Sequence, residues 1–351
     1  EICRLLIERP RVLILDEPTS ALNERETERL FAVLRELSAD GVTILYVSHV
    51  LQEVFAIADH ITVMRNGQAV FSRPRAELTI PTVVEAMVGA RQAELYPPRE
   101  GRPAAAEGAA LEVRGLSVGE ELHEVTFTAK AGEIVGLAGL EGSGVATLLG
   151  VLFGTRRATG GEVRYPDGGG LPASPTAAAR RRISLVPAER RRQGLMLDRS
   201  ISHNIAHVSV GTLPGRDPWL RPRQLAAAAR GQIERLQIKT DSLDSPVDQL
   251  SGGNQQKVVL GKWLEVSPGV MLLDDPTRGV DVGAKREFYL LIRRLAQEGK
   301  IVLFRSTEMP ELVGLADRIL TFYRGRLTAE LVGGQADDHA VLQAINTGQA
   351  A

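Results

Sequence analysis

The chain has 351 residues, of which 44% are hydrophobic, and its formal net charge is −1 at pH 7. This length has room for two or three domains, and the charge gives no reason to expect a general affinity for nucleic acid. A single cysteine, Cys3, excludes a disulfide framework and fits a reducing compartment. No apolar run approaches the roughly 18–20 residues of a membrane-spanning helix, and the first residues do not have the pattern of a secretory leader. We therefore expect a globular protein that is either cytosolic or attached to a membrane only through a partner.

Short apolar runs alternate along the chain with segments that carry apolar residues at helical spacing. Buried parallel strands are expected at Val12–Leu15, Thr43–Val47, Val270–Leu273 and Ile301–Phe304. Helices are expected at Glu24–Leu37 and Lys285–Leu295. This alternation predicts an α/β fold with a mainly parallel sheet.

The chain also repeats itself. VLILDEPTSALN (Val12 to Asn23) returns, after a shift of 258 positions, as VMLLDDPTRGVD (Val270 to Asp281), and the match runs without a gap to Gly67 and Gly325. A period this long indicates a duplicated domain rather than a solenoid. The second copy has much more sequence in front of its repeated part. We therefore expect residues 1–95 to be the C-terminal half of a first domain whose front is missing, residues 111–345 to be a complete second domain, and 346–351 a tail. Residues 96–110 are rich in Pro, Gly and Ala, as in a linker.

The first candidate site follows the strand at Val12–Leu15. Asp16 and Glu17 lie where ligands bind in such sheets, beyond the carboxyl ends of strands. An aspartate there can hold Mg²⁺ and a neighbouring glutamate can deprotonate a water. His49, at the end of the next strand, can hydrogen-bond a γ-phosphate. Taken singly, the acidic pair could merely end a strand and His49 could be a surface or capping residue, but the combined pattern favours a site.

Two glycine-containing stretches are candidates for phosphate binding. LSGGNQQK (Leu250 to Lys257) opens a helix expected at 255–264. Its free backbone N–H groups and its serine hydroxyl can therefore bind an anion. The alternative is that the serine only caps the helix and the two glycines only add flexibility. GLEGSGVATLL (Gly139 to Leu149) lies between an expected strand at 133–138 and a helix at 148–153, the layout of a phosphate loop. Val145 and Ala146 occupy the positions due a lysine and a magnesium-binding hydroxyl.

The chain resembles the ATP-binding cassette ATPases, and more narrowly the tandem-cassette subunits of bacterial monosaccharide importers. The resemblance rests on LILDEPTSAL with YVSH, GEIVGLAGLEGSG, VPAERRRQGL, LSGGNQQKVVLGKWL and AMVGARQAELYPP. It implies two P-loop NTPase-type cassettes, each with peripheral β and α subdomains around a mainly parallel sheet flanked by helices. It also implies ATP and Mg²⁺ as cofactors, transmembrane permease subunits as partners, and a periplasmic sugar-binding protein as an indirect one. The expected location is peripheral, at the cytoplasmic face of the bacterial inner membrane. A homodimer is possible in such a family, and no nucleic-acid partner is expected.

The resemblance further implies composite sites, each shared by two cassettes that dimerise head to tail. The first site would use Asp16 for metal, Glu17 and His49 for catalysis, and Ser251, Gly252, Gly253 and Asn254 from the other lobe. The second would use Asp274 for metal and, for ATP, Gly139, Gly142, Ser143, Gly144, Val145, Ala146 and Thr147. Asn23 and Asp281 would lie in the inter-lobe loops.

The second site departs from the family pattern repeatedly. Besides Val145 and Ala146, the departures are Asp275 in place of a glutamate, Thr307 in place of a histidine, and Ala188 near the family's glutamine position. Thr147 is a poor substitute for the missing hydroxyl. Together these changes remove most transition-state stabilisation, which dominates phosphoryl transfer. We expect this site to bind phosphate through its main chain but to hydrolyse poorly.

Two alternatives to an importer ATPase remain at this point. One is a soluble tandem-cassette ATPase that acts on the ribosome or nucleic acid, and the other is an inactive fragment. The arginine clusters 180–182 and 190–192 fit a solvated face, a contact with a membrane permease, or a nucleic-acid contact.

Overall fold

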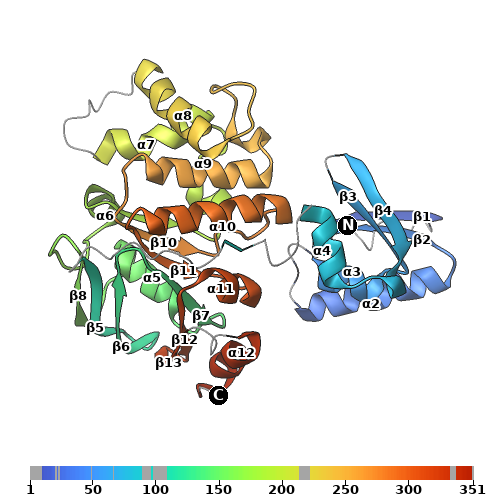
Figure 1. Cartoon of the computed structure of the whole chain (residues 1–351), viewed down its shortest axis with the longest axis horizontal. Helices are drawn as coiled ribbons and strands as arrows, with labels where there is room; N and C mark the ends of the chain where they lie inside the picture. Colours follow the sequence, from blue (N-terminus) through green and yellow to red (C-terminus); the bar gives the residue numbers. More distant parts are fainter. Residues whose placement is uncertain are drawn as a thin grey trace. The chain divides into compact units, whose positions relative to one another are not determined.

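The computed structural model describes residues 10–19, 22, 24–48, 50–65, 67–88, 96–97, 109–212, 222–332 and 337–349. Its contacts divide the chain into two compact units (Figure 1). The first unit comprises residues 1–95 with 281–283, and the second comprises 96–280 with 284–351. Among the described residues, no helix combines the length and the apolar character needed to cross a membrane.

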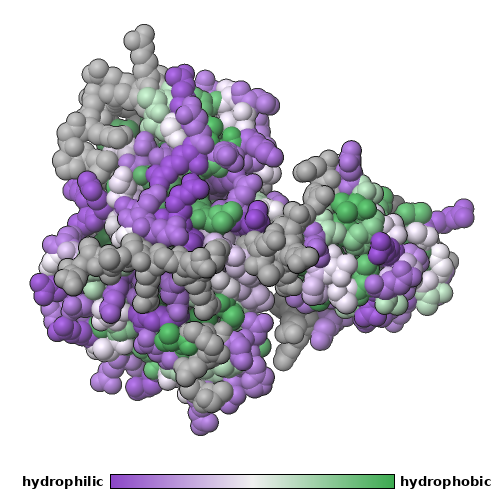
Figure 2. Space-filling model, viewed as in Figure 1, coloured by the Kyte–Doolittle hydropathy of each residue, from purple (hydrophilic) through white to green (hydrophobic). Residues whose placement is uncertain are grey.

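The first unit contains two small sheets and three helices among its described residues. Strands β1 (Val12–Asp16) and β2 (Thr43–Val47) pair in parallel, and helix α2 (Glu24–Ala39) packs Leu30, Phe31 and Leu34 against them. Helices α3 (Leu51–Ile57) and α4 (Ile80–Val88) enclose a second core with the antiparallel hairpin β3 (His60–Arg65) and β4 (Gln68–Pro74). One face of the parallel pair is open to solvent, since Val12, Ile14 and Leu45 are more than half exposed. Figure 2 shows hydrophobic residues at the surface of this unit.

The second unit is built on a six-stranded sheet in the order β13-β12-β7-β11-β10-β9. Its strands are β7 (Ile134–Gly139), β9 (Ile183–Val186), β10 (Val270–Asp274), β11 (Ile301–Arg305), β12 (Arg318–Tyr323) and β13 (Arg326–Val332). Only β13 runs antiparallel to its neighbour. The sheet is mixed and mostly parallel, and helices flank it, which confirms the predicted α/β fold.

Two smaller layers flank this sheet (Figure 1). The strands β5 (Ala110–Val118), β6 (Leu122–Lys130) and β8 (Gly160–Arg164) form an antiparallel sheet. On the opposite side, α7 (Ile201–Thr212), α8 (Pro222–Leu236) and α9 (Gly252–Leu264) pack together. The remaining helices are α5 (Val145–Phe153), α6 (Pro175–Arg180), α10 (Val282–Gln297), α11 (Met309–Leu315) and α12 (Asp338–Thr347). Helices α5, α9 and α10 each begin three residues earlier than the apolar periodicity indicated; the first turn of α9 is rich in glycine, and that of α5 lies within the expected phosphate loop.

The duplication read from the sequence extends to the backbone. The six elements from β1 to β4 have the same bounds as β10, α10, β11, α11, β12 and β13 after the shift of 258 positions. Even the irregularity in the β3–β4 pairing, between Val63 and Met64, recurs between Thr321 and Phe322. The two copies can therefore be compared residue by residue.

Tyr96, the first described residue of the expected linker, packs within the second unit. Its ring stacks on Tyr289 with centroids 5.1 Å apart. A Cβ on Gly314 would lie 2.4 Å from the Tyr96 Cγ, so glycine at 314 is what lets the ring approach α11. The linker is thus anchored on the second unit at its start.

Lys262 is a buried cation in α9. Its ammonium donates to the Gly194 carbonyl and lies 5.6 Å from the centre of the Trp263 ring. Burial lowers the Lys262 pKa to about 8, and burial also lowers the pKa of His207, which feels the charge of Lys262. The folded state therefore disfavours the ammonium form.

This burial predicts a pH-dependent stability. Between pH 8 and about 10.5 the unfolded chain binds more protons than the folded one, so stability rises with pH across this window. Across this pH window, the free energy of unfolding of the wild type should rise by about 3 kcal/mol more than that of a Lys262→Met variant. Urea unfolding at several pH values measures the difference. The control is Lys239→Met, which removes an exposed lysine and should keep the pH dependence of the wild type. If Lys262→Met keeps that pH dependence as well, the prediction is wrong.

Candidate functional site

The first acidic motif lies at the carboxyl end of β1, as expected. Glu17 is exposed, and its backbone is left-handed, with φ 45°. Its amide donates to the Val47 carbonyl at 2.8 Å, which fixes the turn against β2. Glu53 secures the same turn, because its carboxylate accepts hydrogen bonds from the hydroxyls of Thr19 and Tyr46. His49 and Asn23 lie outside the described residues.

The second copy repeats this backbone but uses the carboxylate differently. Asp275 has φ 48°, and its amide donates to the Arg305 carbonyl at 2.9 Å. Its side chain, however, is only 4% exposed and accepts two hydrogen bonds from Thr307, from the amide at 3.1 Å and from the hydroxyl at 2.9 Å. Burial raises the pKa of Asp275, against the lowering effect of the Thr307 bonds. Thr307, which takes the position of His49 in the second copy, thus holds the Asp275 carboxylate by two hydrogen bonds.

The two candidate metal ligands also differ in their surroundings. Asp274 Oδ1 accepts a hydrogen bond from Arg305 Nη1 at 2.6 Å, because the parallel register places these residues opposite each other. In the first copy the register partner of Asp16 is Val47, which carries no charge. Asp16 therefore fits one of the carboxylates that Mg²⁺ takes beside phosphate oxygens. Asp274 is already paired with Arg305, and its role as a metal ligand stays a prediction. No group of three or more potential metal ligands occurs among the described residues.

The loop Gly139–Thr147 has the close packing of a phosphate loop. Gly144 has φ 98°, and a Cβ there would meet the Glu121 carbonyl oxygen at 2.7 Å. A Cβ on Gly139 would lie 2.3 Å from Ser143 Oγ, whereas one on Gly142 would meet no atom within 4 Å. Val145 is 1% exposed and so belongs to the core, and Ala146 is exposed. Since α5 begins at Val145, its first N–H groups have no intrahelical acceptor and are available to an anion.

Three side chains meet at the first turn of α5. Thr147 Oγ1 donates to Glu121 Oε2 at 2.6 Å, and Arg156 Nη1 donates to the same oxygen at 2.5 Å. Arg156 Nη1 also lies 3.4 Å from Thr147 Oγ1. These hydrogen bonds, with that to Thr147 the larger cause, lower the pKa of Glu121. Thr147, considered above as a substitute metal ligand, is engaged with a carboxylate.

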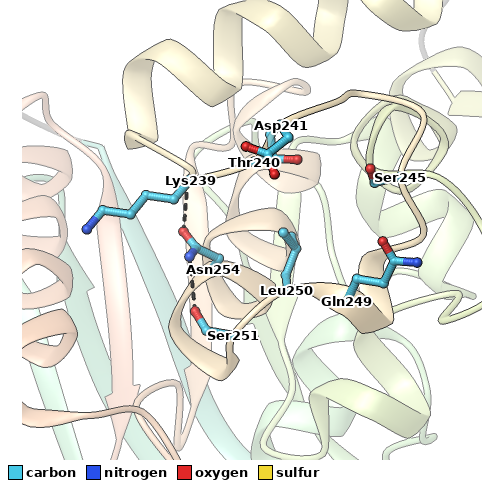
Figure 3. A pocket seen from close by; sticks show the side chains of 8 residues that line it. All are labelled: Lys239, Thr240, Asp241, Ser245, Gln249, Leu250, Ser251 and Asn254. Atoms are coloured by element: carbon cyan, nitrogen blue, oxygen red, sulfur yellow. Dashed lines mark hydrogen bonds between the residues drawn. The ribbon is translucent and has the colours of Figure 1, made fainter. Parts of the chain in front are cut away.

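The LSGG stretch forms the start of α9. Asn254 Nδ2 donates to Ser251 Oγ at 3.0 Å, and Asn254 Oδ1 accepts from the Lys239 amide at 3.0 Å (Figure 3). These residues line a cavity of about 360 Å³ together with Thr240, Asp241, Ser245, Gln249 and Leu250. The Lys239 side chain extends away from the other labelled side chains.

One arginine of each cluster is tied into the second unit. Arg190 donates to the carbonyls of Arg278 and Gly279 at 2.6 and 3.2 Å, and a Cβ on Gly252 would lie 2.8 Å from its Nη2. Glu189, next to Ala188, accepts from Arg278 Nη1 at 3.0 Å. Arg181 pairs with Asp167 and lies over the Tyr165 ring. Arg181 and Arg190 are therefore not simply solvated surface residues.

Within the second unit, the structure thus brings Asp274, Asp275 and Thr307 to neighbouring strand ends, and it places Ser251 to Asn254 beside Arg190. Asp281 is exposed just before α10. The pairing of Glu17 with Ser251 across two lobes stays a prediction. Sequence reasoning missed Arg305, Arg156 and Glu121. Comparing the copies could have found Arg305, since a cation replaces Val47 at the end of a buried strand.

The comparisons with known proteins concern the family and the fold. The ABC transporter family model matches residues 122–278. The ribose import ATP-binding protein RbsA 2 of Rhizobium etli is 40% identical over 98% of this chain and 68% of its own length. The ribose import ATP-binding protein RbsA of Bacillus subtilis is 39% identical over 97% of this chain and 69% of its own.

Solved structures share the fold. A nucleotide-free ATP-binding cassette from an ABC transporter has a TM-score of 0.57 at 20% identity, covering 65% of this chain and 93% of that one. A dimeric ATP-binding cassette bound to ADP and Pi has a TM-score of 0.54 at 22% identity, covering 63% and 97%.

The fold and the loop at the start of α5 define a P-loop nucleotide-binding cassette. The chain belongs to the family of ABC transporter ATPases, within the group of ATP-binding subunits that includes the ribose import proteins.

Proposed function

We propose that this chain energises the import of a simple sugar, with ribose as the first candidate, by binding and hydrolysing ATP beside a separate membrane permease. The observation that carries the proposal is the 40% identity to a ribose import ATP-binding protein over 98% of this chain. The signature Ser251–Asn254 at the start of α9 supports it, since a serine hydroxyl and helix N–H groups suit a phosphate.

The two nucleotide sites divide the work in this proposal. Hydrolysis takes place where Asp16 holds Mg²⁺, Glu17 activates water, and His49 contacts the γ-phosphate, completed by Ser251 to Asn254 of the other lobe. The site of Asp274 and Asp275 binds nucleotide without efficient hydrolysis. The hydrogen bonds from Arg305 and Thr307 to these two carboxylates support this division.

The partners follow from the importer role. We propose that the chain associates with transmembrane permease subunits on the cytoplasmic face of the inner membrane and acts indirectly with a periplasmic sugar-binding protein. A head-to-tail arrangement of cassettes, or a homodimer, would bring the two lobes of each site together. A ribosome- or nucleic-acid-directed ATPase is not favoured, because the relatives named above are import proteins.

The proposal is tested by sugar uptake. The full-length subunit, with the expected front half of its first cassette in place, is expressed with a ribose permease and binding protein in cells that lack their own ribose ATP-binding subunit, and uptake of radiolabelled D-ribose is measured. Uptake above the empty-vector level is expected, and unlabelled D-xylose and D-galactose serve as competitors to define the sugar. A chain that neither co-purifies with the permease nor restores uptake of any of the three sugars would contradict the proposal.

A further inference from the structure

The second phosphate loop lacks a cation at its usual position. Val145 stands there and is 1% exposed, so its side chain packs in the core instead of facing a ligand. Main-chain N–H groups remain, but the loop Gly139–Thr147 contains no cationic side chain and carries the acidic Glu141, so the negative charges of ATP have no cationic partner within it. Another part of the second unit brings a cation to this place.

Arg156 reaches the loop because the chain turns back along α5. Helix α5 ends at Phe153 and is capped by Gly154, whose backbone is left-handed with φ 80°, and the amides of Thr155 and Arg156 donate to the Gly150 carbonyl. The absence of a side chain at Gly150 makes room for the stem of Arg156. A Cβ there would lie 3.0 Å from Thr155 Oγ1, a tight contact, and 3.4 Å from Arg156 Cδ, at the lower limit of ordinary van der Waals contact. The guanidinium thereby arrives 3.4 Å from Thr147 Oγ1, in the first turn of the helix.

We propose that Arg156 replaces the missing lysine and binds the phosphates of a nucleoside triphosphate held by the loop Gly139–Thr147, with Glu121 as its partner when no nucleotide is bound. The proposal rests on the nucleotide-binding role of the second cassette proposed above. A guanidinium suits this task, because its planar fork donates two parallel hydrogen bonds to phosphate oxygens and stays charged.

The present partner of Arg156 is suited to exchange. The Arg156 and Glu121 side chains are 48% and 56% exposed, and an ion pair this exposed to water contributes little to stability. Nucleotide phosphate can therefore take the place of the carboxylate at small cost. Glu121 also accepts a hydrogen bond from the Thr147 hydroxyl. Its carboxylate thus engages both Thr147 and Arg156, and its negative charge repels an incoming polyanion. Glu121 and Arg156 should consequently have opposite effects on nucleotide affinity.

The test is equilibrium ATP binding to the 351-residue chain by calorimetry, with Arg156→Ala, Glu121→Gln and Arg157→Ala compared with the wild type. Arg156→Ala should raise the Kd about ten-fold or more, the range of a hydrogen bond to a charged group. Arg156→Lys should recover part of the loss, and Glu121→Gln should lower the Kd several-fold. Arg157 is the matched control, because it is an exposed arginine one position further on, and its removal should change the Kd less than two-fold.

Several results would overturn the assignment. Arg156→Ala within two-fold of the wild type would do so, as would an equal loss in Arg157→Ala, which would indicate only a general charge effect. Weaker binding in Glu121→Gln would mean that the carboxylate supports the loop instead of competing with phosphate. Thermal unfolding of each variant without nucleotide shows whether a loss reflects misfolding, and the opposite effect of Glu121→Gln cannot arise that way. No binding by the wild type would contradict the nucleotide role of this loop as well, whereas sugar uptake tests the importer role separately.

Discussion

Glu17→Gln is expected to reduce ATP turnover by the importer assembled from the full-length subunit and its permease about 10²-fold or more, whereas Asp275→Asn should change it less than about three-fold. A general base contributes about 10²–10⁴-fold to such a reaction, and glutamine cannot accept the proton. The two residues share the same left-handed backbone and the same amide hydrogen bond to the neighbouring strand. Glu17 is exposed at the strand end, while the Asp275 carboxylate is buried and bonded twice by Thr307.

The measurement is phosphate release at saturating ATP, with nucleotide binding followed in parallel to show that Glu17→Gln still binds. Thr307→His serves as a companion variant, because it restores the histidine position of the first copy. It should not raise turnover, since Asp274 remains paired with Arg305. Equal losses in Glu17→Gln and Asp275→Asn would show that both sites hydrolyse ATP and that the asymmetry proposed here is wrong.

Glu311→Ala is expected to lower the free energy of unfolding of the second unit by about 3–5 kcal/mol, the range found when one partner of a buried ion pair is removed. Glu311 is 1% exposed and accepts hydrogen bonds from the hydroxyls of Thr277, Tyr289 and Ser306. It also lies 3.0 Å from the Lys285 ammonium. Removing the carboxylate leaves three buried hydroxyls without this acceptor and Lys285 with only Glu308.

Urea unfolding measures this loss, and Glu287→Gln is the control. Glu287 pairs with Lys257 at 2.6 Å, but its side chain is 57% exposed, so its replacement should cost less than about 1 kcal/mol. Thr277 follows Asp275 and Ser306 precedes Thr307, so Glu311 fixes both strand ends of the second site. Similar losses in the two variants would mean that this buried network does not stabilise the unit.

Much of the architecture was accessible from the sequence because the repeat is long and ungapped. The apolar runs located the strands, and the shift between the copies proved to be a shift between whole elements. Helix starts were less accurate: α9 begins at Gly252 and α5 at Val145. The glycines at the start of α9 carry no apolar signal, and Val145 was assigned to the phosphate loop. The lost lysine and hydroxyl of the second phosphate loop were likewise visible as Val145 and Ala146.

The sequence by itself determined that this protein is a duplicated cassette with one altered phosphate loop, because local motifs and apolar spacing are properties of neighbouring residues. Only the tertiary structure decided which partners the site residues have. The parallel register sets Asp274 opposite Arg305 but Asp16 opposite Val47, and the turn after α5 carries Arg156 back to Glu121 and Thr147. Such pairings join residues far apart in the chain, so they depend on strand register and on close packing at glycines, which no single stretch of sequence encodes.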